Sequence, residues 1–415
     1  MQVQTILNHV EKQKGFVYGK TSFGPGRLSL EVELRPHGRS RPMCSRCGRK
    51  GSCYDTGRLR RFEFVPLFGI AVFFLYRMRR VNCDLCGVKV ERVPWSDGKH
   101  RTTFSYRLFL SRWAKRLSWQ ETSLIFGTSW DTVFRAVRWV VHWGIANQEV
   151  TNLEAIGVDE IQYRRGHRYL TLVYQIDSGC RRLLYVAKDR TENSLRGFFE
   201  VMPEKVIKDI RFVCSDMWRG YLKVIAERCG DAVHVLDRFH VMQKFNDRLN
   251  EVRAEEARQL QTDGYEPVLK HSRWCLLKRR ENLTSKQTVT LKKLLQYNLR
   301  SVRAYLMRED FQRFWQYRSA HWAGRFLDEW CVRAMRSQLT PMKKMAGTLR
   351  GHRELLLNWF RAKGEYSSGC VEGLNGKAKL AIRKAYGFKS YETIEIALYH
   401  QLGRLPEPIS NHRFC

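Results

Sequence analysis

The chain has 415 residues, 43% of them hydrophobic, which is enough for several folded cores and excludes disorder as the dominant state. Its 74 lysines and arginines against 41 aspartates and glutamates give a net charge of +33, which favours a polyanionic partner. The longest apolar run, residues 64–76, is shorter than the ~20 residues of a membrane span, and no signal peptide is recognisable. These features predict a soluble, cytoplasmic protein.

Two pairs of cysteines near the N-terminus have the spacing of zinc ligands. Each pair has two residues between its cysteines and a glycine directly after the second one, which lets the backbone turn so that both thiolates reach one ion. The four thiolates of Cys44, Cys47, Cys83 and Cys86 would complete a tetrahedral zinc site, with Cys53 outside it. The alternative is four unrelated free thiols, which the repeated glycine-tailed pattern disfavours.

The segment between the cysteine pairs is rich in aromatic and β-branched residues. Residues 59–65 and 70–81 are expected to be strands with a turn at 66–69, which predicts the hairpin of a zinc ribbon. A structural zinc would supply folding energy that so small a domain lacks. We assign residues 1–100 to an N-terminal zinc-ribbon domain.

Two helices joined by a tight turn are expected at residues 119–126 and 129–143. Each begins with a capping-box pattern, at 118–121 and 128–131, and Gly127 lies between them. Such a pair is typical of a helix-turn-helix domain, whose second helix enters the major groove with its N-terminal residues at base edges. An ordinary pair of antiparallel helices explains the isolated pattern equally well.

The second helix has an inner stripe formed by Val133, Val137 and Val140. Residues 1–150 hold 26 lysines and arginines against 11 acids, and this charge favours DNA because basic side chains supply the salt-sensitive part of its binding. We therefore predict a helix-turn-helix domain at 101–150 that contacts DNA through the outward residues Ser129, Thr132, Arg135 and Arg138.

Residues 151–241 alternate between predicted strands and helices. Three consecutive strands precede a helix, a strand, a helix and a strand, which is the order of an RNase H-like α/β core with a mixed sheet. In that core the first and fourth strands lie side by side. The strands are expected at 155–160, 169–177, 183–188, 210–215 and 232–236, and the helices at 191–201 and 221–229.

Three acids are candidates for a metal site in this core. Asp159 and Asp216 end the first and fourth strands, so they would face each other and hold two divalent ions about 4 Å apart, as in-line attack on a phosphodiester requires. Glu372 lies at a glycine- and asparagine-rich helix start. Each acid alone is equally explained as a solvated surface carboxylate, and only their positions set them apart. Asn375, Lys379 and Arg383 follow Glu372 on the same face of its helix. Lys379 and Arg383 are candidate contacts to the DNA backbone.

The second and third acids are separated by 155 residues, which predicts a helical insertion at 242–366. Phe245, Leu249 and Val252 share one helix face, and a capping box occurs at 284–287. The tryptophans of the insertion are expected in its core rather than stacked on unpaired bases, and they are Trp274, Trp315, Trp322, Trp330 and Trp359. The remaining assignments are the last helices of the core, at 367–402, and a C-terminal tail, at 403–415.

Five short motifs occur in order along the chain: GVDE at 157–160, SDMWRGY at 215–221, DRFH at 237–240, VEGLN at 371–375 and KAYGF at 384–388. This combination resembles bacterial DDE insertion-sequence transposases, and the ISL-three-type family in particular. The resemblance extends over residues 40–402. It implies the same layout of a zinc ribbon, a helix-turn-helix and an RNase H-like core.

The resemblance also implies the activity and its site. The catalytic triad is Asp159, Asp216 and Glu372, which bind two Mg²⁺ ions that Mn²⁺ can replace. The acid of the DRFH motif, Asp237, belongs to the fifth strand, so the second catalytic acid is assigned to Asp216. The partners are double-stranded DNA, as terminal inverted repeats and as target, and further copies of the chain in a homodimer or larger assembly. Bound to DNA, the protein would be associated with the nucleoid.

Two other functions stay open at this point. One is an RNase H-like nuclease or resolvase that cleaves without joining, and the other is a zinc and helix-turn-helix regulator with a silent catalytic domain. Loss of any acid would favour the regulator, and all three are present. A tyrosine or serine recombinase would need a nucleophile with a constellation of arginines, which we do not find.

Overall fold

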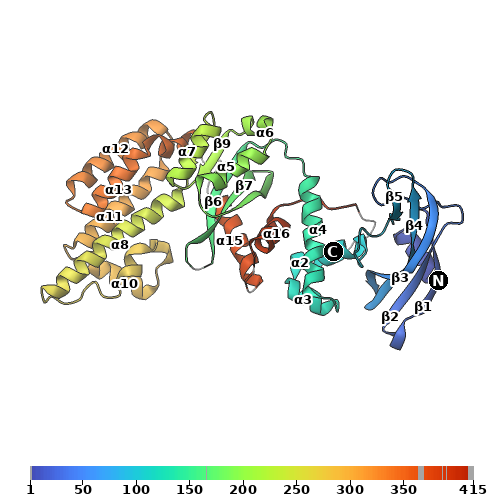
Figure 1. Cartoon of the computed structure of the whole chain (residues 1–415). Helices are drawn as coiled ribbons and strands as arrows, with labels where there is room; N and C mark the ends of the chain where they lie inside the picture. Colours follow the sequence, from blue (N-terminus) through green and yellow to red (C-terminus); the bar gives the residue numbers. More distant parts are fainter. Residues whose placement is uncertain (1, 165, 363–368, 386, 389, 410–415) are drawn as a thin grey trace. The chain divides into compact units, whose positions relative to one another are not determined.

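A computed structural model describes residues 2–164, 166–362, 369–385, 387–388 and 390–409 (Figure 1). They form two compact units, called here the N-terminal unit (Met1–Glu149 with Leu380–Cys415) and the central unit (Val150–Lys379). Within the described residues, no helix has the length and apolar character that crossing a bilayer requires. Among the sequence-predicted segments, residues 363–368, Tyr386 of the KAYGF motif and residues 410–415 lie outside the described part.

The N-terminal unit begins with a sheet of strand order β1-β2-β4-β3, in which β5 also pairs with β4. The predicted hairpin is confirmed, because β3 and β4 pair antiparallel. Their turn is formed by Phe68 and Gly69, which both have positive φ, as a two-residue turn of type I′ requires. The elements are α1 (Val3–Val10), β1 (Phe16–Phe23), the short η1 (Pro25–Arg27), β2 (Ser29–Pro36), β3 (Ser52–Leu67), β4 (Ile70–Cys83) and β5 (Gly87–Val90).

The helices that follow carry the predicted capping signals. Ser118 and Glu121 exchange both hydrogen bonds of a capping box at the start of α3. The second predicted box is wrong by one residue, because Ser129 and not Thr128 caps α4, where it accepts from the amide of Thr132 at 3.1 Å. The predicted valine stripe of α4 is buried, as expected. The helices of this unit are α2 (Phe104–Arg116), α3 (Trp119–Ile125), α4 (Trp130–Ala146) and, near the C-terminus, α16 (Tyr391–Leu402).

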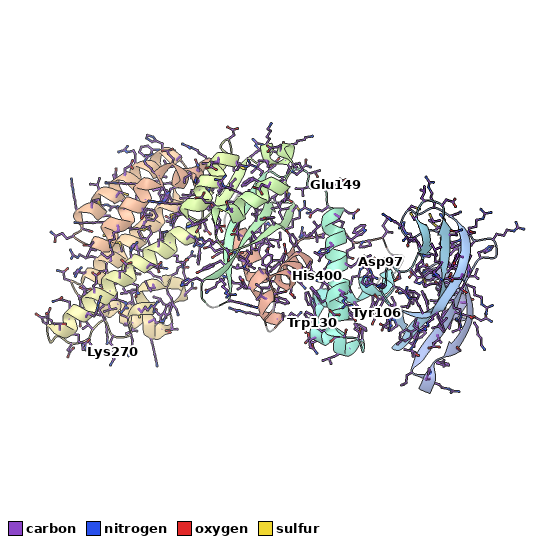
Figure 2. All side chains as sticks on the ribbon, in the orientation of Figure 1. Asp97, Tyr106, Trp130, Glu149, Lys270 and His400 are labelled. Carbon is purple, nitrogen blue, oxygen red and sulfur yellow. The ribbon has the colours of Figure 1, made fainter. Side chains whose placement is uncertain are left out.

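The C-terminal segment packs within the N-terminal unit. His400 of α16 shares a buried hydrogen bond of 2.9 Å with Ser111 of α2, and Glu407 pairs with Arg112 and Lys115 at 2.9 and 2.8 Å. His400 and Glu149, the last residue of the first segment of this unit, are labelled in Figure 2. The boundary at Leu380 falls inside helix α15 (Gly369–Lys384), whereas the sequence reasoning kept residues 367–402 together.

The central unit contains a five-stranded sheet of order β10-β9-β6-β7-β8. β6, β7 and β8 pair antiparallel, whereas β6, β9 and β10 pair parallel. The first and fourth strands of this region are therefore neighbours, as predicted. The elements are β6 (Ala155–Arg164), β7 (Arg168–Asp177), β8 (Cys180–Lys188), α5 (Glu192–Val201), α6 (Glu204–Lys208), β9 (Phe212–Ser215), α7 (Arg219–Arg228) and β10 (Val233–Leu236).

Both faces of this sheet are covered, so its inner strands are buried continuously rather than on alternate residues. Leu195 and Phe198 of α5 and Val224 of α7 pack with sheet residues in one core. On β6 a Cβ added to Gly157 would lie 2.4 Å from a side-chain carbon of Val371 in α15. The glycine of the GVDE motif thus allows the close approach of α15 to the strand that carries Asp159.

The rest of the central unit is helical, as predicted, with the long α8 clearly visible in Figure 1. Phe245, Leu249 and Val252 of α8 are fully buried, and the capping box of Thr284 with Gln287 is present. The elements are α8 (Arg238–Thr262), α9 (Arg273–Leu277), η2 (Arg280–Asn282), α10 (Ser285–Leu294), α11 (Arg300–Phe311), η3 (Gln312–Gln316), α12 (Ala320–Arg336), α13 (Thr340–Gly351) and α14 (Arg353–Arg361).

The tryptophans of these helices divide into two groups. Trp315 and Trp330 are buried and Trp359 packs partly buried against the same core. Trp274 and Trp322 are about half exposed, with relative exposures of 53% and 54%, so the prediction that all five are core residues was wrong for these two. Helical spacing alone does not reveal which side of a helix another helix covers.

Candidate active site

Three aspartates lie at the edge of the sheet where the parallel pairing of β6, β9 and β10 ends. The prediction that Asp159 ends its strand was wrong, because β6 continues to Arg164 through its antiparallel pairing with β7. Asp159 is on β6, Asp216 directly follows β9 and Asp237 directly follows β10. All three are buried, with exposures of 6%, 7% and 3%. Because parallel strands end at the same edge of a sheet, their acids converge there even though they are up to 78 residues apart in sequence.

Helix α15 holds the carboxylate of Asp159. Its Oδ2 accepts a hydrogen bond of 2.6 Å from Nδ2 of Asn375, and its Oδ1 accepts one of 2.8 Å from the amide of Glu160. The Oδ1 of Asn375 in turn accepts from the hydroxyl of Tyr174 on β7 at 2.8 Å. The Tyr174 contact fixes the orientation of the Asn375 amide, so Asn375 must present its NH₂ group to Asp159.

Asp237 and His240 form a second pair beside Asp159. Asp237 caps α8 by accepting from the amide of Phe239 at 2.6 Å, and its other oxygen accepts from Nδ1 of His240 at 2.8 Å. Possible ligand atoms of Asp159, Asp237 and His240 all lie within 4.8 Å of one another. Sequence reasoning did not assign Asp237 or His240 to the site. The available signal was an acid at a strand end with a histidine three residues later, in the first turn of a helix.

Asp216 is held by other partners. Its Oδ2 accepts from Nη2 of Arg190 at 2.6 Å, and its Oδ1 accepts from the amide of Trp218 at 2.9 Å. Nη1 of the same arginine pairs with Glu160 at 2.9 Å, and the guanidinium lies 5.1 Å from the ring of Trp218. Arg190 therefore links Asp216 to the residue next to Asp159 and neutralises part of the negative charge of the cluster.

The last sequence-predicted acid, Glu372, is exposed near the start of α15. Burial of part of its side chain, followed by the charge of Asp237, raises its pKa, so the two carboxylates are close enough to repel each other. On the same helix Lys379 and Arg383 are exposed, whereas Asn375 is buried against Asp159. The polar face predicted for this helix therefore has one buried residue, Asn375, while Glu372, Lys379 and Arg383 are exposed to solvent.

The crowding of acids changes their protonation. Burial, with help from the charges of Asp237 and Asp216, raises the pKa of Asp159 to about 6. Burial and the charge of Asp216 raise the pKa of Glu160 to about 7. Burial opposes the charged form of His240, but its hydrogen bond to Asp237 and the surrounding carboxylates raise its pKa to about 9. Without a cation the cluster is thus short of positive charge at neutral pH.

The sequence model of the ISL3-type DDE transposases matches residues 156–398, which is more than half of the chain and includes all of these acids. The chain belongs to this transposase family. The transposase of insertion sequence element IS1001 from Bordetella parapertussis is 29% identical over 371 residues, covering 89% of this chain and 90% of that protein. The transposase of IS1557 from Mycobacterium tuberculosis is 29% identical over 408 residues, covering 92% and 90%. The resemblance inferred from the five motifs is confirmed.

The four predicted zinc ligands of this transposase come together. Cys44, Cys47, Cys83 and Cys86 have sulfur atoms within 4.8 Å of one another, and Cys47 and Cys83 are 3.5 Å apart. A hydrogen bond from the backbone of Cys47 lowers the pKa of Cys44 to about 7, which favours the thiolate. Cys53 is exposed and outside the group. Four converging thiolates are the donor set that structural zinc prefers.

The predicted DNA contacts of the transposase on α4 have local partners. Ser129 is the helix cap, and its hydroxyl also lies 2.9 Å from that of Thr132. Arg135 pairs with Asp131 at 2.7 Å, and Arg138 pairs with Glu392 of α16 at 3.1 Å. These pairs are largely solvent-exposed, so their net stabilisation is small, ~0–1 kcal/mol, and the arginines can exchange partners at little cost.

Proposed function

We propose that this transposase binds the terminal inverted repeats of its element, cleaves the DNA there and joins the freed 3′-hydroxyl ends to target DNA. The proposal rests on one observation above the others. In a chain of the transposase family, three buried acids from β6 and from the ends of β9 and β10 converge at one sheet edge, and burial raises the pKa of Asp159 and of its neighbour Glu160. Such a cluster is a site prepared for divalent cations rather than for a substrate carboxylate or phosphate alone.

In this proposal the central unit is an RNase H-like core and Asp159, Asp216 and Glu372 hold two Mg²⁺ ions, which Mn²⁺ can replace. The donor set fits, because it consists of hard oxygen ligands, and a buried oxygen of Glu160 lacks a hydrogen-bond partner among the described residues. When bound, such ions activate the attacking oxygen and stabilise the leaving 3′-oxygen.

The residues around the acids have positioning roles. Asn375 and the amide of Glu160 each donate to one oxygen of Asp159, so together they fix the orientation of this carboxylate. Arg190 holds Asp216 and neutralises charge, and each oxygen of Asp216 keeps a further lone pair that a cation could use. Asp237 and His240 lie close enough to Asp159 to serve as alternative ligands, which makes Asp237 the decisive comparison for Asp216.

The N-terminal unit has the DNA-recognition role in this proposal. Helices α3 and α4 form a helix-turn-helix that contacts the repeats through Ser129, Thr132, Arg135 and Arg138, and a zinc ion holds the ribbon at its four cysteines. Lys379 and Arg383 on the exposed face of α15 contact the DNA backbone. Two chain copies or more assemble on the paired ends, since both ends of an element must be processed together.

The experiment is an assay of purified protein with labelled element ends, an unlabelled target and Mg²⁺. Cleaved ends together with joined products are expected. Cleavage without any joined product would instead favour a nuclease or resolvase, and end-binding without cleavage would favour a regulator. Random DNA of the same length and base composition serves as the control for end specificity.

A further inference from the structure

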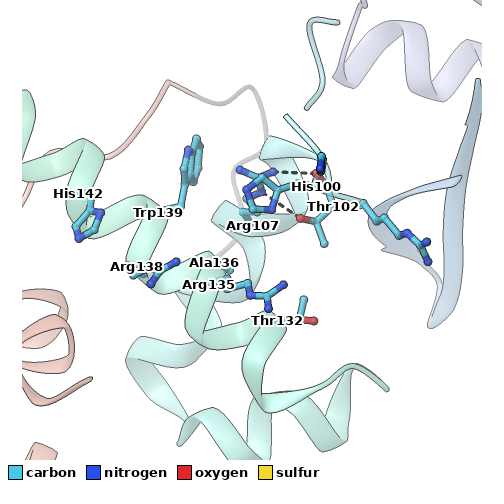
Figure 3. A pocket seen from close by; sticks show the side chains of 11 residues that line it. His100, Thr102, Arg107, Thr132, Arg135, Ala136, Arg138, Trp139 and His142 are labelled. Carbon is cyan, nitrogen blue, oxygen red and sulfur yellow. Dashed lines mark hydrogen bonds between the residues drawn. The ribbon is translucent and has the colours of Figure 1, made fainter. Parts of the chain in front are cut away.

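A hollow of about 470 Å³ lies in the N-terminal unit, between the loop that precedes α2 and one face of α4 (Figure 3). Its volume falls within the ~300–1,000 Å³ of ligand sites, but its lining is cationic and polar rather than apolar. We call it the basic pocket. It is lined by Lys99, His100, Arg101, Thr102, Arg107, Thr132, Arg135, Ala136, Arg138, Trp139 and His142.

Some cations that line the basic pocket are not neutralised by an ion pair with a carboxylate. Five of its residues are lysines or arginines. Three of them pair with carboxylates, Arg107 with Asp97 at 2.7 Å, Arg135 with Asp131 and Arg138 with Glu392. The other two are Lys99 and Arg101, which are exposed and have no ion pair within the described part of the chain. The pocket thus presents two unpaired cations to an incoming anion.

Arg107 gives this pocket a rigid wall. Its side chain is only 4% exposed. Its Nε donates to the hydroxyl of Thr102 at 3.0 Å and its Nη2 to Asp97, while the guanidinium lies 5.3 and 5.5 Å from the rings of Phe104 and Trp139. Figure 3 shows Arg107 and the α4 residues Thr132 and Arg135 around the same hollow. A planar cation held in this way is ordered before any ligand arrives, which reduces the entropy cost of binding.

We propose that the basic pocket holds backbone phosphates of duplex DNA directly beside the base pairs that α4 reaches. The proposal rests on the proposed function, because it assumes that the N-terminal unit binds DNA. Thr132 and Arg135 are in the first turns of α4 and line the pocket, so an anion there lies next to the residues assigned to base edges. The excess of cations over residues 1–150 attracts an extended polyanion more than a single small anion.

The pocket therefore separates two kinds of contact on one surface. Lys99 and Arg101 act on the backbone without regard to sequence, whereas Thr132, whose hydroxyl also contacts that of Ser129, is the residue assigned to a base. Phosphate contacts fix the register of a helix in the groove but carry no sequence information themselves. A helix-turn-helix as short as α3 and α4 gains this register from the loop beside it.

The test compares two double variants by fluorescence anisotropy on element-end and random duplexes over a range of salt. Lys99→Ala with Arg101→Ala removes the two unpaired pocket cations. Lys20→Ala with Arg58→Ala is the matched control, which removes the same charge from exposed sheet residues outside the pocket. The pocket variant is expected to bind both duplexes about tenfold more weakly and to lower the salt slope by about two, and the control is expected to stay near the wild type.

The possible outcomes separate the pocket from the proposed function. Equal losses in both double variants would mean that general surface charge is responsible, and an unchanged salt slope in the pocket variant would equally overturn the proposal. Competition by inorganic phosphate at constant ionic strength would assign the pocket to a free anion instead. If the wild type bound element ends no better than random DNA, the proposed recognition of the element ends would be wrong. The contribution of the pocket to DNA affinity would still follow from the difference between the two double variants. Thermal melting checks the fold, and single Gln substitutions at Lys99 and Arg101 repeat the test if the double variant melts early.

Discussion

Asn375 donates a hydrogen bond of 2.6 Å to Asp159, so a helix near the end of the chain positions the acid of a strand that lies 216 residues earlier. The contact is buried on both sides, with exposures of 6% for each residue. It also explains why Gly157 and Val371 touch, since the amide reaches the carboxylate only if α15 approaches β6 closely. The VEGLN motif on α15 and the GVDE motif on β6 therefore contact each other directly.

Replacement of Asn375 by Ala should reduce cleavage of element ends without loss of DNA binding. The change leaves the buried carboxylate of Asp159 without its strongest side-chain partner, at a cost of ~1–3 kcal/mol, and frees it to rotate. Since ~1.4 kcal/mol is tenfold in rate, this cost corresponds to a loss of about five- to 150-fold. Gly376→Ala on the same helix is the control, because a Cβ there meets open space. An equally active Asn375→Ala protein would remove Asn375 from the positioning role.

The variants Asp159→Asn, Asp216→Asn and Glu372→Gln should each abolish cleavage and joining while end-binding persists. Each removes a charged ligand with little change in volume. The comparison is Asp237→Asn, because the structure brings Asp237 and not Asp216 within ligand distance of Asp159 and His240. Loss of activity in Asp237→Asn with retained activity in Asp216→Asn would transfer the second ligand to the fifth strand. Recovery with Mn²⁺ would support a ligand role, because Mg²⁺ demands a stricter geometry.

Much of the fold was predictable because its signals are local. Capping residues such as Ser118, glycine-tailed cysteine pairs and apolar runs each act within a few neighbouring residues, and the structure confirms them. The pairing of β6 with β9 followed from the order of strands and helices, and with it the convergence of Asp159 and Asp216 at one sheet edge.

The remaining features depend on side-chain contacts between distant segments. The contact of Asp159 with Asn375, the link from Arg190 to Asp216 and the packing of His400 on Ser111 each join residues that no local pattern connects. A single sequence shows that Asp237 and Asp216 both end strands. It contains no local signal for which of them turns toward Asp159.

One zinc ion per chain is expected by elemental analysis of protein purified without chelator. Cys44→Ser should abolish zinc binding, because three thiolates do not complete the tetrahedral site and the ribbon loses its cross-link. Cys53→Ser should keep the full zinc content, since Cys53 is exposed and apart from the cluster. Metal-free protein with four freely titrating thiols would reject the site, and zinc loss in Cys53→Ser would change its ligand set.

Acid should destabilise the chain through His400, whose ring is buried against Ser111. Burial, and then the charge of Lys115, lower the pKa of His400 to about 3, below the ~6.5 of an unfolded histidine. The unfolded chain therefore binds a proton that the folded chain excludes, so this contribution to stability is complete above pH ~6.5 and is lost as pH falls toward 3. Between pH 7 and 5 the loss is ~2 kcal/mol for this one group, at ~1.4 kcal/mol per pH unit below 6.5.

Urea unfolding at both pH values should show a smaller pH effect in His400→Gln, which can keep a hydrogen bond to Ser111 but does not titrate. His9→Gln, at an exposed position on α1, controls for the loss of any histidine and should follow the wild type. If His400→Gln lost as much stability between pH 7 and 5 as the wild type does, His400 would not be the group that titrates.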